Sequence, residues 1–342
     1  MLKKAVAVLM ASAMVTGLAG CSSQEAPKET EAAGEKKVSA AFIIPGSISD
    51  GAFGTMSYQG VEKVKTAPFV EKADYIEGVS ATTDAAKAIR DYVAEGYDVV
   101  WAQSGLHSSA VMEIAPEFPE TVFVALAAAP EEQKFENMWF ATLECEGAYY
   151  AAGALAAMTT ESNALGIVGG RENPLYVACS KAFEEGAKSI NSDINVMTTF
   201  TGDFNDPIKA KEAAVSQIES GADVLTYFVD AGMTGVIAAA EEQVKAGKQV
   251  WTIGKGSDQY DLASDVMLTS VVYDYGKSME IILESVNNGT KSGVFPLDMT
   301  NDCVYLADFR DRVSEENQKT LNEIIEKVNA GEITYTTQYD VE

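Results

Sequence analysis

Basic residues and histidine are scarce in this chain of 342 residues. Lys and Arg number 25 against 51 Asp and Glu, which gives a formal net charge of −26 at pH 7, and His107 is the one histidine. Nucleic-acid binding needs clustered Lys and Arg against the phosphates, and no such cluster occurs. A Ser-His-Asp arrangement would need a partner for His107, and the sequence suggests none. We therefore expect no nucleic-acid binding and no catalytic triad.

Cysteines are few and far apart. Besides Cys21 there are Cys145, Cys179 and Cys303, without a CxxC pair or a zinc-ligand spacing. These spacings support neither a metal site nor a disulfide framework. We interpret the last three as small buried side chains and expect no metal and no other cofactor.

Only one long hydrophobic run is present, and it lies at the N-terminus. The basic "MLKK" precedes an apolar core, and "LAGC" at 18–21 ends it. This pattern predicts a secretory signal peptide over residues 1–21, and "LAGC" resembles the bacterial lipobox, in which the cysteine is lipidated. Acyl chains such as palmitate on Cys21 would anchor the protein without spanning the membrane. The alternative is an ordinary signal peptide with a chance cysteine.

The segment that follows, residues 22–37, is polar and charged, and it predicts a flexible tether. The rest of the chain is too long for one simple core, which favours two lobes. From residue 38, β-rich runs alternate with segments of helical periodicity. The runs are "VSAAFIIP", "DVVWAQ", "TVFVAL", "ALGIVGG", "INVMTTF", "DVLTYFV", "QVWTIG" and "VMLTSVVY". This alternation predicts an α/β fold with parallel sheets.

A repeated plan supports two similar, doubly wound lobes. Residues 92–105 and 217–232 both run from a helix end through Gly and Asp to a buried strand and a polar tip. Ligands of such sheets bind beyond the carboxyl ends of the strands. The strand tips therefore supply the candidate ligand-binding residues Asp50, Phe53, Gln103, Ser104, Gly105, Gly170, Asp230, Gly254 and Asp258, with Trp101 at the end of its own strand.

Two other patterns are weaker. The glycines at 51–54 and 168–170 match neither GxGxxG nor the P-loop and lack a lysine, so we interpret them as tight turns or points of close backbone approach. Glu144 and Glu146 form a carboxylate pair, but they precede an apolar helix-like segment. We therefore expect them in its first turn, where the helix dipole favours acids.

The stretch "GSISDGAFGTMSYQG" resembles the first loop of the basic membrane protein family, the substrate-binding lipoproteins of ABC transporters that bind purine nucleosides. Similarity continues through "EGAYYAAGALAA", "SGADVLTYFVDAG" and "SDVMLTSVVYDYG", and covers residues 38 to about 310. The resemblance implies the type I periplasmic-binding fold, with a ligand cleft that closes by a hinge motion. It places residues 38–142 and 272–298 in the N-terminal lobe, and 143–271 and 299–342 in the C-terminal lobe.

The resemblance also implies roles for single residues. Asp50 and Phe53 stand where the family has its loop acid and its stacking aromatic. Gly54, Gly256 and Tyr273 replace polar residues that contact the sugar in the nucleoside binders, while Asp230 adds an acid. Unpaired polar groups cost about 1–3 kcal/mol each, so a site without partners for ribose should reject it. Stacking on an aromatic contributes roughly 1–3 kcal/mol with or without the sugar.

We therefore predict a lipid-anchored, extracytoplasmic protein that binds a purine-like nucleobase for an ABC permease and its ATPase. Phe53 is expected to stack on the base, with Trp101 or Tyr176 as the opposite wall. Ring N–H groups would meet acceptors from Asp50, Gln103, Asp230 and Asp258, and Ser104 and Gly105 would offer backbone groups. We expect a monomer. The alternatives are a nucleoside-binding protein, a surface sensor or adhesin without a transport role, and an enzyme acting on a small metabolite.

Overall fold

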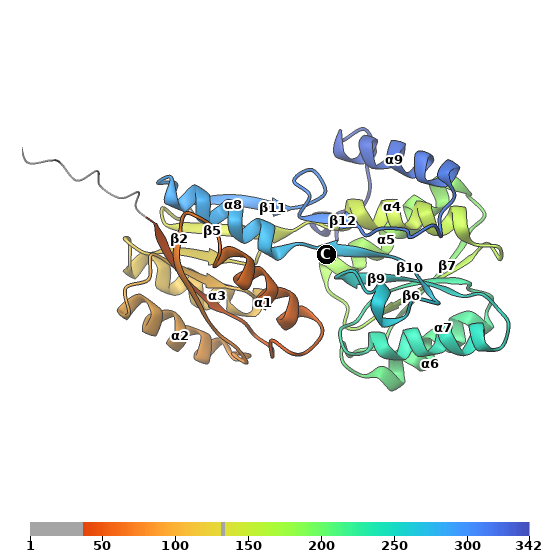
Figure 1. Ribbon diagram of the computed structural model, residues 1–342, viewed down its shortest axis with the longest axis horizontal. Helices are drawn as coiled ribbons and strands as arrows, with labels where there is room; N and C mark the ends of the chain where they lie inside the picture. The colour runs from red at the N-terminus through yellow and green to blue at the C-terminus, as the bar shows by residue number, and fades with distance from the viewer. Residues whose placement is uncertain (1–36, 131–133, 342) are drawn as a thin grey trace, which may run out of the picture. The chain divides into compact units, whose positions relative to one another are not determined.

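Two six-stranded sheets form the body of the protein (Figure 1). The computed structural model describes residues 37–130 and 134–341, so the predicted signal peptide, Cys21 and all but the last residue of the tether lie outside the described residues. The predicted alternation of strands and helices is confirmed, and all eight predicted strand runs are strands.

Sheet A is wholly parallel. Helices α1 (Phe53–Val64) and α8 (Tyr275–Asn287) cover one face, where they lie side by side, and α2 (Thr82–Ala94) and α3 (Ser108–Ile114) cover the other (Figure 1). In spatial order the strands are β11 (Gly293–Leu297), β5 (Met138–Leu143), β4 (Val122–Ala125), β3 (Val99–Ala102), β1 (Val38–Ile43) and β2 (Val70–Ile76).

Sheet B is parallel except for β12, which pairs antiparallel with β10. Helices α4 (Glu146–Thr159) and α5 (Pro174–Ile190) pack on one face, with α9 (Glu315–Asn329) against α4, and α6 (Pro207–Glu219) and α7 (Met233–Lys245) pack on the other. The strand order is β12 (Val304–Leu306), β10 (Met267–Tyr273), β9 (Trp251–Gly256), β8 (Val224–Phe228), β6 (Ala164–Gly169) and β7 (Asn195–Phe200). Single 3₁₀ turns occur at Gly105–His107, Ala115–Glu117, Tyr260–Leu262 and Gln338–Asp340.

Helix starts follow directly from local sequence. Asn173, Asp206, Asp274 and Ser314 each accept a backbone N–H of the first turn of the helix that they precede. Such caps satisfy donors that have no partner inside the helix. Pro174 and Pro207 occupy the first helical position, where a missing N–H costs nothing.

The buried apolar side chains fall into three clusters. One lies under α2 and α3 of sheet A, and another lies under α6 and α7 of sheet B. The third is shared, because it joins side chains of α1 and α8 to those of α4 and α5 without a break. Cys145, Cys179 and Cys303 are all buried, as predicted.

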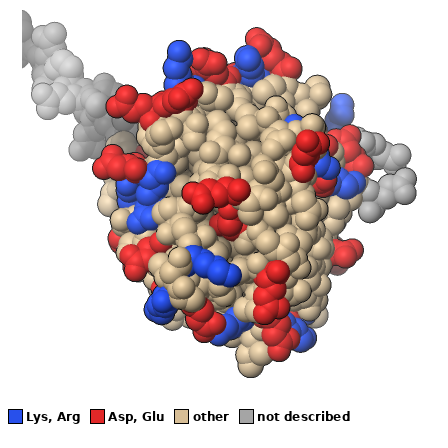
Figure 2. Space-filling view, turned by 90° about the vertical axis from the view of Figure 1, so that its right-hand side faces the viewer, with Lys and Arg blue, Asp and Glu red and all other residues tan. Residues whose placement is uncertain are grey.

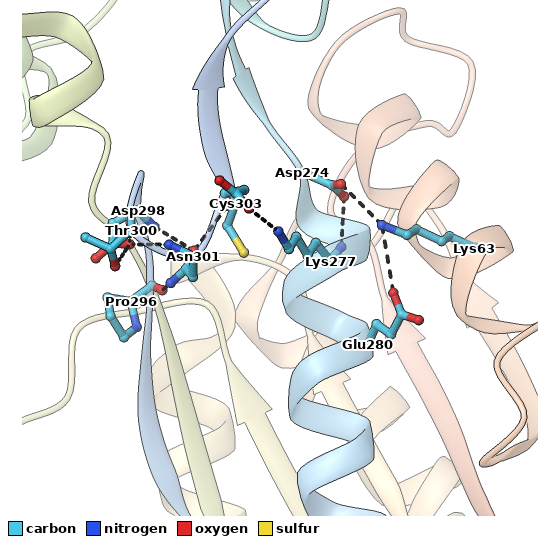
Figure 3. A network of polar contacts seen from close by, with 10 residues as sticks. Lys63, Asp274, Lys277, Glu280, Pro296, Asp298, Thr300, Asn301 and Cys303 are labelled. Carbon is cyan, nitrogen blue, oxygen red and sulfur yellow. Dashed lines mark hydrogen bonds and ion pairs between the residues drawn. The ribbon is translucent and has the colours of Figure 1, made fainter. Parts of the chain in front are cut away.

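The chain crosses between the sheets three times, at residues 144–145, 274 and 298–303. The crossings are bonded to one another. The Glu144 N–H donates to the Leu297 carbonyl at 2.9 Å, and the Asp274 N–H donates to the Cys303 carbonyl at 2.7 Å. The Lys63 ammonium of α1 lies 3.2 Å from the Asp274 carboxylate and so ties α1, which packs on sheet A, to the second crossing. Figure 3 shows this ion pair.

The predicted lobe boundaries differ from these crossings at two points, because Leu143 belongs to β5 of sheet A and residues 272–273 belong to β10 of sheet B. Residues 36–342 form one compact unit, so the division into two lobes stays a prediction. Within the described residues, no helix combines the length and the apolar character needed to cross a membrane.

Candidate functional site

The first loop, between β1 and α1, is organised by Asp50. One carboxylate oxygen accepts the N–H groups of Ala52 at 2.7 Å and Thr55 at 3.0 Å, and the other accepts the N–H of Gly54 at 2.9 Å. The Thr55 hydroxyl donates to the same group at 3.1 Å. Three backbone N–H groups and one hydroxyl thus surround the Asp50 carboxylate, three of them on one oxygen. The geometry therefore gives Asp50 the role of holding the start of α1, and so of presenting Phe53.

Gly54 lies where the loop folds back on itself. A Cβ at this position would lie 2.1 Å from the Ser47 carbonyl oxygen and 2.7 Å from a carboxylate oxygen of Asp50. A larger residue would displace the loop, so Gly54 has a packing role of its own. The interpretation of Gly54 as a lost sugar contact stays a prediction.

Aromatic rings run without a gap from the first loop into sheet B. Phe53 meets Tyr275 edge-on with ring centroids 5.5 Å apart, and Tyr275 meets Tyr273 at 6.4 Å. The Tyr273 hydroxyl is hydrogen bonded to that of Tyr149 at 2.9 Å, and the Tyr149 ring lies 4.8 Å from Phe228.

The far end of this row is Tyr176. Its ring stacks on Phe228 at 5.2 Å and meets Phe204 at 5.8 Å. Phe53, Tyr176 and Phe204 are half-buried, whereas Tyr149, Tyr273, Tyr275 and Phe228 are buried. Phe53, Tyr176 and Phe204 therefore retain exposed ring surface that a planar ligand could contact.

A buried charge pair lies beside Tyr176. The Lys255 ammonium at the end of β9 donates to a carboxylate oxygen of Asp230 at 2.8 Å and to the Tyr176 hydroxyl at 3.4 Å. The Lys255 side chain is 7% exposed and that of Asp230 is 30% exposed. Burial alone would lower the pKa of Lys255, but Tyr176 and Asp230 raise it above its usual range, so the lysine is charged at neutral pH.

This pair keeps free hydrogen-bonding capacity. An ammonium has three N–H donors, and across residues 37–130 and 134–341 only Asp230 and Tyr176 accept from Lys255. The second carboxylate oxygen of Asp230 likewise has no partner within these residues. One donor and one acceptor therefore stand next to each other at the carboxyl ends of β8 and β9.

Two adjoining cavities separate α1 from the strand ends of sheet B. The inner cavity, of about 10 Å³, is lined by Gly51, Ala52 and Met56 on one side and by Asp230, Lys255 and Ser257 on the other. The outer cavity, of about 430 Å³, shares Met56 and Ser257 and adds Gln59, Lys63, Asp258, Tyr273 and Tyr305. The inner cavity holds about one water molecule, so a larger ligand needs α1 to move away from β9.

Four predicted residues lie at the end of β3 or just after it, apart from both cavities. Trp101 and Gln103 are fully buried, and the Trp101 Nε1–H donates to the Gln103 Oε1 at 2.6 Å. Trp101 packs on Phe42 with ring centroids 5.7 Å apart, so it occupies the core. Ser104 accepts the Leu106 N–H at 3.2 Å and caps the short turn that begins at Gly105. Their predicted ligand contacts stay predictions.

The remaining predicted residues are in sheet B. A Cβ on Gly170 would lie 2.2 Å from the Phe204 ring, and one on Gly254 would lie 2.4 Å from the Ser270 hydroxyl, so both glycines permit close packing. Asp258 lines the outer cavity and is bound by the Arg310 guanidinium. The structure thus places Tyr176 beside the Asp230–Lys255 pair and puts Asp230 and Asp258 on adjoining cavities. Phe53 packs against Tyr275, and Trp101 and Gln103 are buried.

Sequence reasoning missed Lys255, Met56, Tyr149 and Tyr275, and it named Tyr273 only as a replaced residue and not as a member of the row. Lys255 had a signal, because a lysine inside the apolar run "VWTIGKG" is costly to bury without a partner. Tyr149, Tyr273 and Tyr275 had none, since they come from segments more than a hundred residues apart. Among the described residues, no group of His, Cys, Asp or Glu could hold a metal ion.

Charge on the surface is mixed. The face in Figure 2 shows acidic side chains interspersed with single or small groups of basic ones, around wide uncharged areas. Such a face lacks the continuous basic stripe that nucleic acids require.

Comparisons with known proteins agree on the family. The family model of PnrA-like ABC transporter substrate-binding proteins matches residues 37–338. An ABC transporter nucleoside-binding protein of Lactococcus lactis subsp. cremoris is 26% identical over 86% of this chain and 87% of its own. A purine-binding protein of Brucella abortus is 25% identical over 87% of this chain and 83% of its own.

The fold comparison agrees with the family. An ABC transporter solute-binding protein of Conexibacter woesei superposes with a TM-score of 0.71 at 25% identity, covering 89% of this chain and all of that one. This similarity confirms the type I periplasmic-binding fold predicted from the sequence.

Proposed function

Because the chain belongs to the Bmp family of ABC transporter substrate-binding proteins, we propose that it binds a purine-like nucleobase between α1 and the strand ends of sheet B. Members of this family bind solutes outside the cytoplasm and are not enzymes. The identity of the ligand, and every residue contact to it, is part of the proposal.

The observation that carries the proposal is the free donor of Lys255 beside the free acceptor of Asp230, next to half-buried rings. Every purine base displays a donor and an acceptor side by side on a flat edge. In the proposed complex Asp230 accepts a ligand N–H, Lys255 donates to a ring nitrogen or carbonyl, and Phe53 and Tyr176 enclose the ring. Charge-assisted hydrogen bonds of this kind are roughly twice as strong as neutral ones.

Two features favour a base without its sugar. Tyr273 takes the place of a lysine in the nucleoside binders, and its hydroxyl is already bonded to Tyr149. Gly256 takes the place of an acid, and Met56 fills the space beside it, 2.8 Å from where a Cβ would lie. The groups that would hydrogen bond to ribose hydroxyls are therefore either replaced, as at Gly256, or already bonded to another residue, as at Tyr273.

The outer cavity favours a second candidate, a nucleoside. Its volume of about 430 Å³ and the polar side chains of Gln59, Lys63 and Asp258 would accommodate a sugar next to the inner cavity. Asp258 and Lys63 already have partners in Arg310 and Asp274, which weighs against this alternative.

The proposal extends to location and partners. We propose a lipid anchor at Cys21, residues 22–37 as a tether, and a monomer that passes its ligand to an ABC permease and its ATPase. A surface sensor or adhesin without a transport role remains the alternative. Uptake of radiolabelled base by cells that lack the gene for this chain distinguishes the two. Uptake should fall if the chain is a transport protein and should be unchanged if it is a sensor or adhesin.

Isothermal titration calorimetry on residues 36–342 tests the ligand. Adenine, guanine, hypoxanthine and uracil are compared with adenosine, guanosine, inosine and uridine. We expect at least one purine base to bind at least tenfold tighter than its nucleoside. Tighter binding of the nucleosides supports the second candidate, and no binding of any of the eight contradicts both.

A further inference from the structure

Two of the three cysteines of the folded body lie in contact. The Sγ atoms of Cys145 and Cys179 are 3.5 Å apart, and both side chains are fully buried. Cys145 precedes the first turn of α4 and Cys179 lies in the second turn of α5. A disulfide has an S–S distance of about 2.05 Å, and the two sulfur atoms already lie in contact and need only approach further to bond.

The contact between the two thiols follows from the close approach of the α4 and α5 backbones. A Cβ on Gly153 of α4 would lie 1.9 Å from the Phe183 carbonyl oxygen, and one on Gly186 of α5 would lie 1.9 Å from the Tyr150 carbonyl oxygen. Helices α4 and α5 therefore touch at two points along their lengths, which leaves little freedom to separate the thiols. Tight packing of this kind holds α4 against α5, and so keeps the backbone segments that carry Cys145 and Cys179 close together.

We infer that Cys145 and Cys179 form a disulfide that joins α4 to α5 beneath the ligand site. The family acts outside the cytoplasm, where disulfides form and persist. In the reaction both S–H bonds break and one S–S bond forms. The two electrons and two protons pass to a disulfide oxidant of the envelope, which leaves as two thiols. This inference does not depend on the identity of the ligand.

The bond is expected to form while the chain folds. Burial raises the pKa of Cys179, which suppresses the thiolate that exchange requires once folding is complete. Cys145 ends the first crossing between the sheets and Cys179 lies in α5, so the bond would tie that crossing to the α4–α5 face of sheet B and not to sheet A.

Peptide mapping provides a direct test, because trypsin places the three cysteines on separate peptides. Cys145 falls in residues 135–171, Cys179 in 172–181 and Cys303 in 292–310. The full chain, expressed with its own N-terminal signal, is isolated from the cell envelope and alkylated without reductant. We expect peptide 135–171 linked to 172–181, two mass units below the sum of the two, and an alkylated 292–310. Full alkylation of all three peptides, or a link to 292–310, overturns the inference.

Refolding the reduced chain in a glutathione redox buffer tests formation independently of the cell. We expect the same linked peptides and a melting temperature several degrees above that of the chain refolded with dithiothreitol. Cys303→Ser is the matched control and should keep this difference, whereas Cys179→Ser should abolish it. Equal melting temperatures for the oxidised and reduced parent chain, without linked peptides, contradict the inference.

Discussion

Lys255 is the residue that most distinguishes the candidate site. A buried ammonium needs a fixed acceptor, and Asp230 supplies it while leaving one oxygen free. Lys255→Met removes the free donor, so we expect base affinity to fall by about 10- to 100-fold, the equivalent of a charge-assisted hydrogen bond. Isothermal titration calorimetry measures the change.

Removal of Lys255 also leaves Asp230 without its partner, which lowers stability as well as affinity. The double variant Lys255→Met/Asp230→Asn should regain part of the lost stability without regaining affinity, because it removes the uncompensated charge. Lys319→Met, at an exposed position of α9, is the control and should bind like the parent. Unchanged affinity in Lys255→Met would remove Lys255 from the site.

Glu146 introduces a pH dependence of stability. Its side chain is 2% exposed and accepts the Gln338 N–H at 2.8 Å, and burial raises its pKa from 4.5 to about 7. The folded state therefore binds more protons than the unfolded state between these two values. The contribution is fully present below pH 4.5 and is lost as the pH rises to 7, by about 3 kcal/mol at most.

Glu146→Gln isolates the pH-dependent contribution of this side chain to stability, since glutamine does not titrate. We expect the difference in free energy of unfolding between parent and variant to change over pH 4.5–7 and to level off above 7. Urea unfolding at a series of pH values measures it, and Glu323→Gln, at an exposed position of α9, controls for the lost charge. A difference that is independent of pH would show that folding leaves the pKa of Glu146 unchanged.

At the scale of elements, the contact between α4 and α5 depends on glycine. Alanine at an exposed helical position is about 1 kcal/mol more favourable than glycine. At Gly153 or Gly186, however, the added Cβ would lie 1.9 Å from a carbonyl oxygen of the other helix. We expect each Gly→Ala substitution to lower the free energy of unfolding by about 3 kcal/mol.

Urea titration of both variants provides the measurement. Ser216→Ala, at an exposed position of α6, should change stability by less than about 0.5 kcal/mol and is the control. Stabilisation of Gly153→Ala would mean that helix propensity outweighs the contact between the helices.

The elements that sequence predicted are those with a strong pattern. Central strands such as β3 and β8 are continuous apolar runs, since both of their faces are buried. Strand β2 has the sequence "VEKADYI" because it lies at the edge of sheet A, where much of it is exposed. Strand β11 contains Pro296 and also lies at an edge, where a missing N–H is tolerated.

The site was predictable only in part, because the position of a residue at a strand tip does not fix the direction of its side chain. Strand tips indicate where a ligand lies, so Phe53, Asp230 and Asp258 could be proposed from position alone. Position does not tell which way a side chain points, and Trp101 and Gln103 at one such tip point into the core. Nor does it reveal partners such as Tyr149 and Tyr273, which meet only when the two sheets are in place.

At the scale of the whole molecule, the proposed ligand is held from two sides that belong to different sheets. Residues 50–56 lie in the loop and helix that follow β1 of sheet A, and residues 255–259 run from the end of β9 of sheet B into the loop after it. A ligand that binds both segments favours the arrangement in which they are close, by an amount set by its differential affinity. At 100 times its dissociation constant it adds about 2.7 kcal/mol to the free energy of unfolding.

Hydrogen–deuterium exchange with and without the base that binds best should therefore show slower exchange in both segments at once. Exchange in α6, residues 207–219, should be unchanged, because α6 covers the face of sheet B opposite to α4 and α5. The Lys255→Met variant, at a base concentration that saturates it, should lose protection chiefly at 255–259. Binding between the sheets requires residues 50–56 and 255–259 to become ordered together. Protection confined to residues 50–56 in the parent chain would therefore place the ligand on the sheet A side alone.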